Sequence, residues 1–455
     1  MIKTVANWSN YPSVKSDESS FSTIIQLDEL MKQNRPSSIR GLGRCYGDAS
    51  LSDHIISTLK FDKIIEFDKQ LGIFECEPGI SLANILEIIV PKGWFLPVTP
   101  GTKYITIGGA VASDVHGKNH HAEGSFSTHV IEMDVITAMG KITCSSIINT
   151  DLFRATCGGM GLTGLVSRVR FKLKKIETAY IRQVQVKAAN LDEIIDLFEQ
   201  YRQSTYTMAW IDCLKGGNSF GRSILMAGEH ALETDLPKIK KNELLVKPPK
   251  LKLAIPFYFP SFALNTLTIK AFNFLYYTKN LKKESHDIVS YDPFFYPLDA
   301  ISGWNKMYGK KGFVQYQFVL PIDNGKVGLI AILAKIRKKG MGSFLAVLKL
   351  FGKQESLIAF PMEGYTLALD FPIKKGLFEF LDELDKIVLD YGGRLYMTKD
   401  ARMKADTFWK SYSHAAEFLQ IINQYNSAQQ FKSSLSERLL IKNSIETTNL
   451  INLYQ

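Results

Sequence analysis

Cysteine is scarce in this sequence, and its spacing excludes two classes of protein. The 455 residues include five cysteines: Cys45, Cys76, Cys144, Cys157 and Cys213. An odd number without a CxxC pair does not form a disulfide framework or a structural zinc site. We therefore expect free thiols and a reducing compartment, the cytoplasm.

Long apolar runs and low-complexity tracts are also missing. No uninterrupted apolar segment reaches the length of a membrane span, and the first residues, MIKTVANWSNYPSV, lack the apolar core of a signal peptide. The chain is 45% hydrophobic and 22% charged, a balance that excludes a disordered tail or a fibre. Because 455 residues exceed what one hydrophobic core usually organises, we expect two domains.

The chain has no excess of acidic charge. Its 55 basic and 45 acidic residues give a net charge of +10, which favours phosphate-bearing ligands, membrane surfaces or nucleic acid as partners. The sequence has no zinc-finger spacing and no ribonucleoprotein-type aromatic motif. A nucleic-acid partner is therefore not expected.

The first third alternates short strands, tight turns and helices. Residues 71–77 are strand-like, and Ser81 is a suitable N-cap for a helix through residue 90 with its apolar side chains on one face. From about residue 179 the glycine clusters end, and strands alternate with helices such as residues 191–202. We expect the second domain to begin there.

Three glycine-dense segments carry the strongest functional signal. They are RGLGRCYGD at residues 40–48, PGTKYITIGGAVASDVHGKNHHAEGSF at 100–126 and CGGMGLTGLV at 157–166. Glycine permits positive backbone angles, so successive amide N–H groups can converge on a pyrophosphate. One such loop is more often a simple turn, and the first lacks the GxGxxG spacing of a dinucleotide-binding βαβ unit. Three together indicate a cofactor laid along a groove.

One apolar segment allows two interpretations. Residues 247–283 combine aromatic and aliphatic side chains with flanking lysines, and prolines break the segment into pieces too short to cross a bilayer. Such a segment either lies at a membrane interface, where it helps a lipid-linked substrate enter, or forms a buried helix with a solvated basic end. Peripheral membrane contact is therefore one of two open expectations.

The three glycine segments, in this order, resemble the FAD-binding domain of the vanillyl-alcohol-oxidase and para-cresol-methylhydroxylase (PCMH) superfamily. Within it, the sequence is similar over nearly its whole length to the decaprenylphosphoryl-β-D-ribose 2′-oxidase family. The likeness includes GWNKMYGKKGFVQYQFVLP (303–321), FLAVLKLFG (344–352), LDFPIKKG (369–376) and YGGRLYMTKDAR (391–402). It implies an α+β fold with a PCMH-type FAD-binding domain of residues 1–178 and 393–455. A substrate-binding domain of residues 179–392, built on an antiparallel sheet with helices, completes it.

The resemblance also implies which residues contact the cofactor. FAD is expected to lie against Arg40, Gly41, Leu42, Gly43, Arg44, Cys45, Tyr46, Gly47, Asp48, Gly101, Thr102, Thr106, Gly108, Gly109, Ser113, His116, Gly161, Val166 and Tyr396. Members of the wider superfamily often tether the flavin through a histidine in the first glycine loop. Arg44 takes that place here, and Cys45 after it is more simply a packing residue, so we expect FAD to bind without a covalent link.

The resemblance further places polar side chains around the flavin ring and the substrate. Lys399, Tyr46 and His116 are implied as catalytic, and the implied substrate-binding residues are Gln315, Gln317, Lys349, Tyr296 and Ala368. Hydride transfer from a carbinol needs a base for the hydroxyl proton and a cation near the reduced flavin, and Lys399 is the leading candidate for one of these roles. Without the surrounding motif, however, a lone lysine is more readily a solvated surface charge. The two glutamines alternate on a strand and share one side, either as ligands for a polyol or as a polar sheet face.

Histidines and three substitutions complete the candidate site. A metal is not expected, because the spacing of the histidines lacks a partnered carboxylate or cysteine; they are His116, His120, His121 and His129. Mycobacterial members of the family have a cysteine where this chain has Ala368, and asparagines where it has Thr366 and Ala346. We expect these changes to line the substrate pocket and to give poor reactivity toward agents that trap that cysteine.

The expected activity is FAD-dependent oxidation of a sugar hydroxyl to a ketone. The resemblance implies the 2′-hydroxyl of a polyprenyl-phosphate pentose or a related precursor of cell-envelope glycans. This reaction is the first half of an epimerisation, which a short-chain NAD(P)H-dependent reductase completes. Two alternatives stay open: an aldonolactone or sugar-alcohol oxidase acting on a soluble polyol, and a non-catalytic glycan- or lipid-binding protein that lost the flavin.

Overall fold

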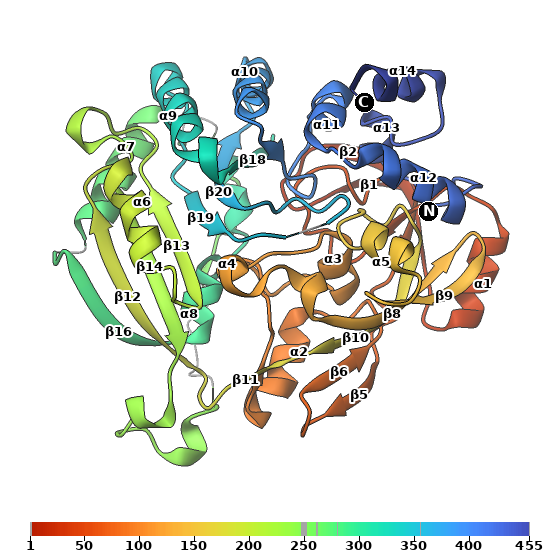
Figure 1. The fold of residues 1–455 in the computed structure, drawn as a ribbon, viewed down its shortest axis with the longest axis horizontal. Coiled ribbons are helices and arrows are strands. Elements are labelled where there is room, and N and C mark those ends of the chain that lie inside the picture. The colour runs from red at the N-terminus through yellow and green to blue at the C-terminus, as the bar shows by residue number, and fades with distance from the viewer. Residues whose placement is uncertain (1, 247–252, 261–262, 280, 355, 455) are drawn as a thin grey trace.

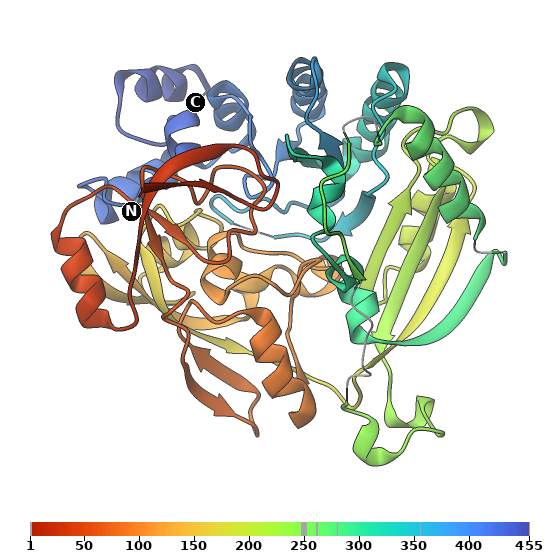
Figure 2. The same cartoon turned by 180° about the vertical axis from the view of Figure 1, so that it is seen from behind.

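The fold has two regions, and both ends of the chain belong to the first of them. The computed structural model describes residues 2–246, 253–260, 263–279, 281–354 and 356–454. Figure 1 shows one region built from the N-terminal third and the C-terminal end, beside a second region built from the middle of the chain. Both chain ends lie on the first region in each view (Figures 1 and 2).

Two sheets organise the first region. A four-stranded sheet has the order β1-β2-β4-β3, and a five-stranded antiparallel sheet has the order β5-β6-β10-β8-β9. The strands are β1 (Ile2–Ala6), β2 (Ser13–Ser20), β3 (Ser38–Arg40), β4 (His54–Ser57), β5 (Ile64–Asp68), β6 (Ile73–Cys76), β8 (Val130–Thr137), β9 (Gly140–Cys144) and β10 (Leu165–Lys172). The helices between them are α1 (Ile24–Lys32), α2 (Leu82–Ile89), α3 (Ile107–Ala112), α4 (His120–Glu123) and α5 (Thr150–Thr156).

The second region is built on one eight-stranded antiparallel sheet. Its strands in spatial order are β16 (Glu284–Ser290), β12 (Tyr180–Ala188), β14 (Ser223–His230), β13 (Tyr206–Ile211), β19 (Ala346–Phe351), β20 (Gly364–Pro372), β18 (Phe313–Pro321) and β21 (Arg394–Leu395). Helices α6 (Leu191–Gln200), α9 (Ile322–Lys339) and α10 (Leu377–Asp390) pack on this sheet. Helix α8 (Tyr291–Phe295) packs beside β16 and β12, whereas α7 (Thr266–Thr278) lies against β13 and the end of β12, through Tyr276 on Trp210 and the Tyr277 hydroxyl on the Ala188 carbonyl. The expected α+β fold with an antiparallel substrate-side sheet is confirmed.

The chain then returns to the first region. After β21 it forms α11 (Ala405–Ser411), α12 (Ala415–Tyr425), α13 (Ser434–Arg438) and α14 (Ile445–Tyr454). Two small sheets pair β7 (Trp94–Phe95) with β11 (Lys174–Lys175) and β15 (Leu253–Ala254) with β17 (Ile301–Ser302). Short 3-10 turns are η1 (Val90–Lys92), η2 (Phe126–His129), η3 (Gly217–Ser219), η4 (Glu233–Asp235), η5 (Lys241–Glu243), η6 (Pro297–Ala300) and η7 (Trp304–Tyr308). The domain boundaries themselves stay predictions.

Local sequence signals account for several of these elements. The Ser81 side chain caps α2 by accepting a hydrogen bond from the Asn84 amide, and the apolar face of the helix is buried as its spacing indicates. The helix ends before η1, because Pro91 and the left-handed Gly93 (φ 79°) stop it. The strand expected at residues 71–77 is β6, and the helix expected at 191–202 is α6.

The structure describes only part of the apolar segment at residues 247–283. Residues 247–252, 261–262 and 280 lie outside the described residues. Within the described part of the segment, helix α7 runs from Thr266 to Thr278. In the described part of the chain no helix combines the length and apolar character needed to cross a bilayer.

Candidate active site

The three glycine segments meet in the folded chain. Gly41 of the first packs so closely on Thr106 of the second that a Cβ there would clash with the threonine side chain. The third bonds to the second through two backbone hydrogen bonds, from Gly158 N–H to the Val111 carbonyl (3.0 Å) and from Met160 N–H to the Ala112 carbonyl (2.9 Å). The loops therefore form one continuous backbone wall, as the sequence indicates.

The returning C-terminal segment closes this wall. The Tyr46 amide donates to the Thr398 carbonyl (2.9 Å), and the Tyr396 hydroxyl donates to the Ser113 carbonyl (3.0 Å). A Cβ at Gly47 would overlap the Asp400 backbone, so glycine is required for this contact. Residues 396–400 thus join the first and second glycine loops.

One cavity of about 660 Å³ lies between this wall and the eight-stranded sheet. Each of five strands turns alternate side chains toward it, as the two-residue period of a strand requires. These pairs are Gln183 and Gln185, Met208 and Trp210, Gln315 and Gln317, Val347 and Lys349, and Thr366 and Ala368. Helices α9 and α10 pack beneath β18 and α9 beneath β20, so that face of the sheet is a core.

Most of the predicted site residues line this cavity. They are Gly41, Leu42, Gly43, Arg44, Cys45, Tyr46, Gly101, Thr102, Thr106, Gly108, Gly109, Ser113, His116, Gly161, Val166, Gln315, Gln317, Lys349, Ala368, Tyr396 and Lys399. They come from segments as distant in sequence as residues 41 and 399, and the fold brings them together.

Four predicted residues lie behind the cavity wall instead. Arg40 donates to the Ala6 carbonyl (3.1 Å), Gly47 packs on Asp400, and Asp48 accepts two hydrogen bonds from Arg438 (2.7 and 2.9 Å). The Tyr296 hydroxyl shares a 2.6 Å hydrogen bond with Thr99, which itself lines the cavity. In this structure these side chains support the wall, and their direct contact with cofactor or substrate stays a prediction.

The expectation that all three substitutions line the pocket is corrected in part. Thr366 and Ala368 line the cavity, but Ala346 is fully buried on the opposite face of β19. The alternation of the strand explains the difference, because Val347 and Lys349 take the cavity side.

The glycines leave room that fits FAD. Gly101 and Gly161 line the cavity, and a Cβ at Gly101 would meet no atom within 4 Å while one at Gly161 would meet only Ile39 at 3.9 Å. Gly43 has a positive φ of 61°, which side-chain-bearing residues rarely adopt. His116 adds an unsatisfied group: its buried Nδ1 has no hydrogen-bond partner among the residues described. Open backbone loops beside an unpartnered buried donor or acceptor are what a bound dinucleotide would complete.

His116 is the polar centre of an aromatic enclosure. Its Nε2 lies 3.2 Å from the Gln317 amide nitrogen, and its ring packs against Phe351 and Tyr396 at 4.8 and 5.1 Å between centroids. Burial, with help from the nearby Lys349 charge, holds the pKa of His116 well below its ordinary value. His116 is therefore a neutral imidazole that accepts or donates a hydrogen bond but carries no charge.

Lys399 stands over Tyr46 at the other side of the enclosure. Its ammonium lies 3.8 Å from the centre of the Tyr46 ring, and burial lowers the pKa of Lys399 to about 7 although Asp370 opposes the shift. The Gln315 amide donates to Asp370 (2.6 Å), and so does the Tyr308 hydroxyl (3.0 Å). Burial raises the pKa of Asp370 to about 6 despite these bonds. Lys399 can thus act as a cation or, once deprotonated, as a base near neutral pH.

Arg44 and Cys45 occupy the place where relatives in the superfamily carry a tethering histidine. The Arg44 guanidinium stacks 4.0 Å from the centre of the Trp8 ring. The Cys45 sulfur lies 3.4 Å from the Ser50 hydroxyl, and burial raises the pKa of this thiol above its ordinary value. Neither group is an activated nucleophile.

Two site residues were missed by sequence reasoning. Lys118 lines the cavity two positions after His116. Asp370 lies near Lys399 and accepts hydrogen bonds from Gln315 and Tyr308. The signal for both was present, because they fall within the motifs at residues 100–126 and 369–376, but a lone charge in a motif does not reveal which way it points.

The cysteines and the possible metal-ligating side chains indicate no second site among the described residues. All five cysteines lie in the described part of the chain and are free thiols. Across the described ranges no group of three or more histidine, cysteine, aspartate or glutamate side chains is placed to hold a metal ion.

Comparison with known proteins agrees with this geometry. Residues 22–145 match the family model described as FAD binding domain. Decaprenylphosphoryl-beta-D-ribose oxidase of Mycolicibacterium smegmatis is 36% identical over 408 residues, which cover 88% of this chain and 88% of that protein. A protein from the mprA 5′ region of Streptomyces coelicolor is 28% identical over 79% of this chain and 100% of its own length. L-gulonolactone oxidase of Scyliorhinus torazame is 26% identical over 43% of this chain and 44% of that enzyme.

Fold, cavity and comparisons together define an FAD-dependent oxidoreductase. The likeness to the mycobacterial enzyme covers 88% of this chain, so it extends into both regions. The chain belongs to the decaprenylphosphoryl-β-D-ribose oxidase family.

Proposed function

We propose that this enzyme oxidises a secondary hydroxyl of a polyprenyl-phosphate sugar to a ketone, at the 2′-position of a pentose or a related glycan precursor. The observation that carries the proposal is the shared cavity. Flavin-binding loops form one wall, and a sheet face with two glutamines and a lysine forms the other. The substrate named for the mycobacterial relative supports this choice.

In this proposal the glycine loops hold the cofactor, and polar side chains of the cavity contact the sugar. FAD, when bound, supplies the acceptor for the hydride. Gly101 and Gly161 leave open space beside the cavity, and the backbone amides of the glycine loops would hold the pyrophosphate of FAD. The roles of the side chains that meet the sugar can be assigned separately.

In this proposal Gln317 and His116 orient the sugar, because both are neutral and reach the cavity from opposite walls. Lys399 stabilises negative charge on the reduced ring or takes the hydroxyl proton. The aromatic enclosure of Phe351, Phe360 and Tyr396 limits water around the reacting carbon. FAD is bound without a covalent link in this proposal, because Arg44 and the protonated Cys45 offer no tether.

The product chemistry implies a partner reaction. A ketone next to the anomeric carbon becomes the inverted alcohol when hydride is returned to the other face. A short-chain NAD(P)H-dependent reductase is the class of enzyme that performs this step, so the two together carry out an epimerisation.

Helix α7 supports contact with a membrane surface, where a polyprenyl substrate resides. Leu267, Phe274 and Leu275 form an apolar stripe that faces solvent, with exposed fractions of 76%, 56% and 65%. The opposite side is anchored by Asn273, which is fully buried and donates to Asp212 (2.8 Å). A soluble helix normally turns its apolar side inward, so this stripe indicates a partner.

The same helix touches both the cavity and basic side chains. Phe272 and Tyr276 line the cavity from α7. Exposed lysines at 270, 279, 282 and 283 surround the helix, and their charge complements an anionic lipid surface. A lipid tail leaving the cavity beside Phe272 would enter the bilayer that the stripe contacts.

Flotation with vesicles of phosphatidylcholine and phosphatidylglycerol tests this contact. We expect the wild type to float and the double variant Phe274→Glu, Leu275→Glu to remain in solution. The matched control changes Ile147 and Ile148 to glutamate; these side chains are also exposed, by 84% and 54%, but lie near β9 and α5 at the far side of the molecule (Figure 1). Equal flotation of wild type and double variant would overturn the membrane contact.

Anaerobic reduction of the bound flavin tests the activity. We expect the flavin absorbance to bleach with a farnesyl-phosphate pentose and far more slowly with the free pentose. Equal rates would favour a soluble-polyol oxidase of the L-gulonolactone oxidase kind. A protein that binds the lipid sugar but no flavin would be a non-catalytic binding protein.

A further inference from the structure

Three lysines reach the cavity, but only one of them has an opposing carboxylate. Lys399 has the Asp370 side chain near it. Lys118 and Lys349 form no ion pair within residues 2–246, 253–260, 263–279, 281–354 and 356–454. Lys103, another buried lysine of the same loop, shows the usual arrangement, with Asp292 at 2.6 Å.

The surroundings of Lys118 do little to offset its charge. Its side chain is only 8% exposed, and the nearest compensating groups are the faces of the Phe294 and Phe295 rings, at 5.4 and 5.7 Å. Burial, increased by the neighbouring Lys349 charge, lowers the pKa of Lys118 to about 7, and burial lowers that of Lys349 to about 8. A buried ammonium without a counter-charge costs stability, and such groups persist where a ligand supplies the charge.

We propose that Lys118 and Lys349 form the subsite for the phosphate group of the substrate. The inference rests on the proposed function and adds a recognition element to it. Lys118 follows His116 on the second glycine loop, and Lys349 pairs across the sheet with Thr366, next to Gln317. The two lysines therefore flank the place where the sugar is held, one from each wall of the cavity.

The position separates this site from the cofactor's own phosphates. The three glycine loops offer backbone amides for the FAD pyrophosphate, whereas Lys349 projects from the opposite sheet. Lysine binds phosphate as a mobile point charge, which suits a phosphodiester whose lipid half is not recognised in detail. Such a pair would favour a polyprenyl-phosphate sugar over the same sugar without phosphate.

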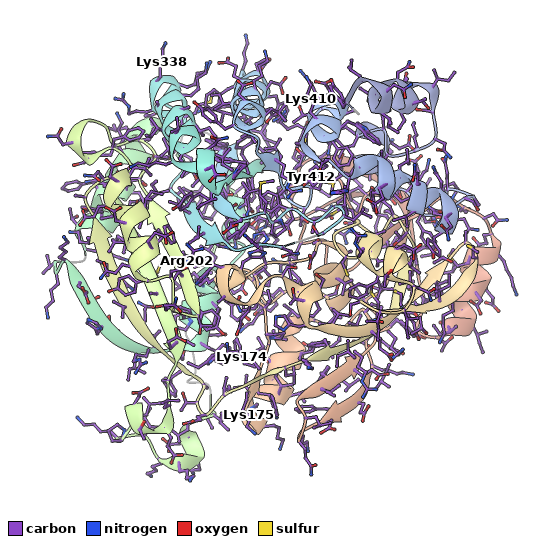
Figure 3. The ribbon with its side chains drawn as sticks, in the orientation of Figure 1. Lys174, Lys175, Arg202, Lys338, Lys410 and Tyr412 are labelled. Carbon is purple, nitrogen blue, oxygen red and sulfur yellow. The ribbon has the colours of Figure 1, made fainter. Side chains whose placement is uncertain are left out.

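Single variants with matched controls test the subsite. Lys118→Met and Lys349→Met keep much of the side-chain volume and remove the charge. Lys338→Met is the control, because this lysine is exposed near the end of α9 and points away from the molecule (Figure 3). Steady-state kinetics are measured with a farnesyl-phosphate pentose and with the corresponding farnesyl pentoside that lacks the phosphate.

We expect each cavity variant to raise KM for the phosphorylated substrate by about tenfold or more, since a hydrogen bond to a charged group contributes more than one between neutral groups. KM for the phosphate-free pentoside should rise much less, so that the preference for the phosphorylated substrate falls by about tenfold, and FAD content should stay stoichiometric. Loss of FAD would assign the lysines to the cofactor's phosphates instead. An equal loss on both substrates, or no loss on either, would also overturn the proposal.

Thermal unfolding gives a readout that does not depend on turnover. Inorganic phosphate should raise the Tm of wild type and of Lys338→Met, but should have little effect on either cavity variant. Without phosphate, both cavity variants should melt roughly 1–4 °C above wild type, because an uncompensated charge is gone. Lys103→Met should melt below wild type, since it removes the buried ion pair with Asp292. If the phosphate shift persists in both cavity variants, the subsite is refuted even when no sugar substrate is turned over.

Discussion

Replacing Lys399 by methionine removes a buried cation that lines the cavity near the Asp370 carboxylate, 3.8 Å from the centre of the Tyr46 ring. Methionine retains the contact with the ring and loses the charge. Two unit charges about 4 Å apart interact by about 4 kcal/mol at an effective dielectric of about 20. A single preorganised donor at a developing anion is typically worth about 2.7–4 kcal/mol.

We expect the contribution of Lys399 to lie at the lower end of that energy range. Asp370 offsets part of its charge, and with a pKa of about 7 roughly half of the molecules carry the ammonium at neutral pH. We therefore expect flavin reduction in Lys399→Met to slow by about a hundredfold, which corresponds to about 2.7 kcal/mol. FAD content should be unchanged.

Anaerobic stopped-flow absorbance at the flavin maximum measures this rate at saturating substrate, with Lys338→Met as the control. The pH profile of the wild type then separates the two roles of Lys399. An ammonium that stabilises negative charge is present below the pKa of about 7, so the rate should fall as pH rises through that value. A free amine acting as base would make the rate rise instead. A reduction rate within threefold of wild type in Lys399→Met would refute both roles.

Further variants test the cofactor wall and its support. Gly43→Val forces a β-branched residue to a φ of 61° and should abolish copurification of FAD, measured as the ratio of flavin to protein absorbance. Arg438→Met leaves Asp48 and Asp400 buried without their shared cation, so denaturant unfolding should show a loss of about 3–5 kcal/mol. Ala368→Cys should gain labelling by a small thiol reagent that substrate protects against, because this position lines the cavity.

Sequence patterns predicted the parts of the fold that depend on neighbours in the chain. The Ser81 cap and the apolar face of α2 were readable because capping and helical spacing act within a few residues. The cavity-facing pair Gln315 and Gln317 was readable for the same reason, since alternation fixes a shared face. The resemblance added the glycine loops and Lys399.

Contacts between distant segments were beyond sequence reasoning. Asp48, whose contact with the cofactor stays a prediction, pairs with Arg438, which lies 390 residues further along the chain. Ala346 was expected in the pocket, but the register of β19 turns it into the core. The sequence does not show that Lys118 is buried away from the carboxylates that the structure describes, because this depends on side chains from distant segments. For the same reason it does not show that the apolar stripe of α7 faces solvent.

We propose that one cavity holds both FAD and a phosphorylated lipid sugar. Anaerobic titration of the purified protein with a farnesyl-phosphate pentose, followed by flavin absorbance, tests both halves at once. We expect a yellow protein with about one FAD per chain, and one equivalent of substrate should bleach it. A colourless protein that does not take up added FAD, or a yellow one that no polyprenyl-phosphate sugar bleaches, would contradict it.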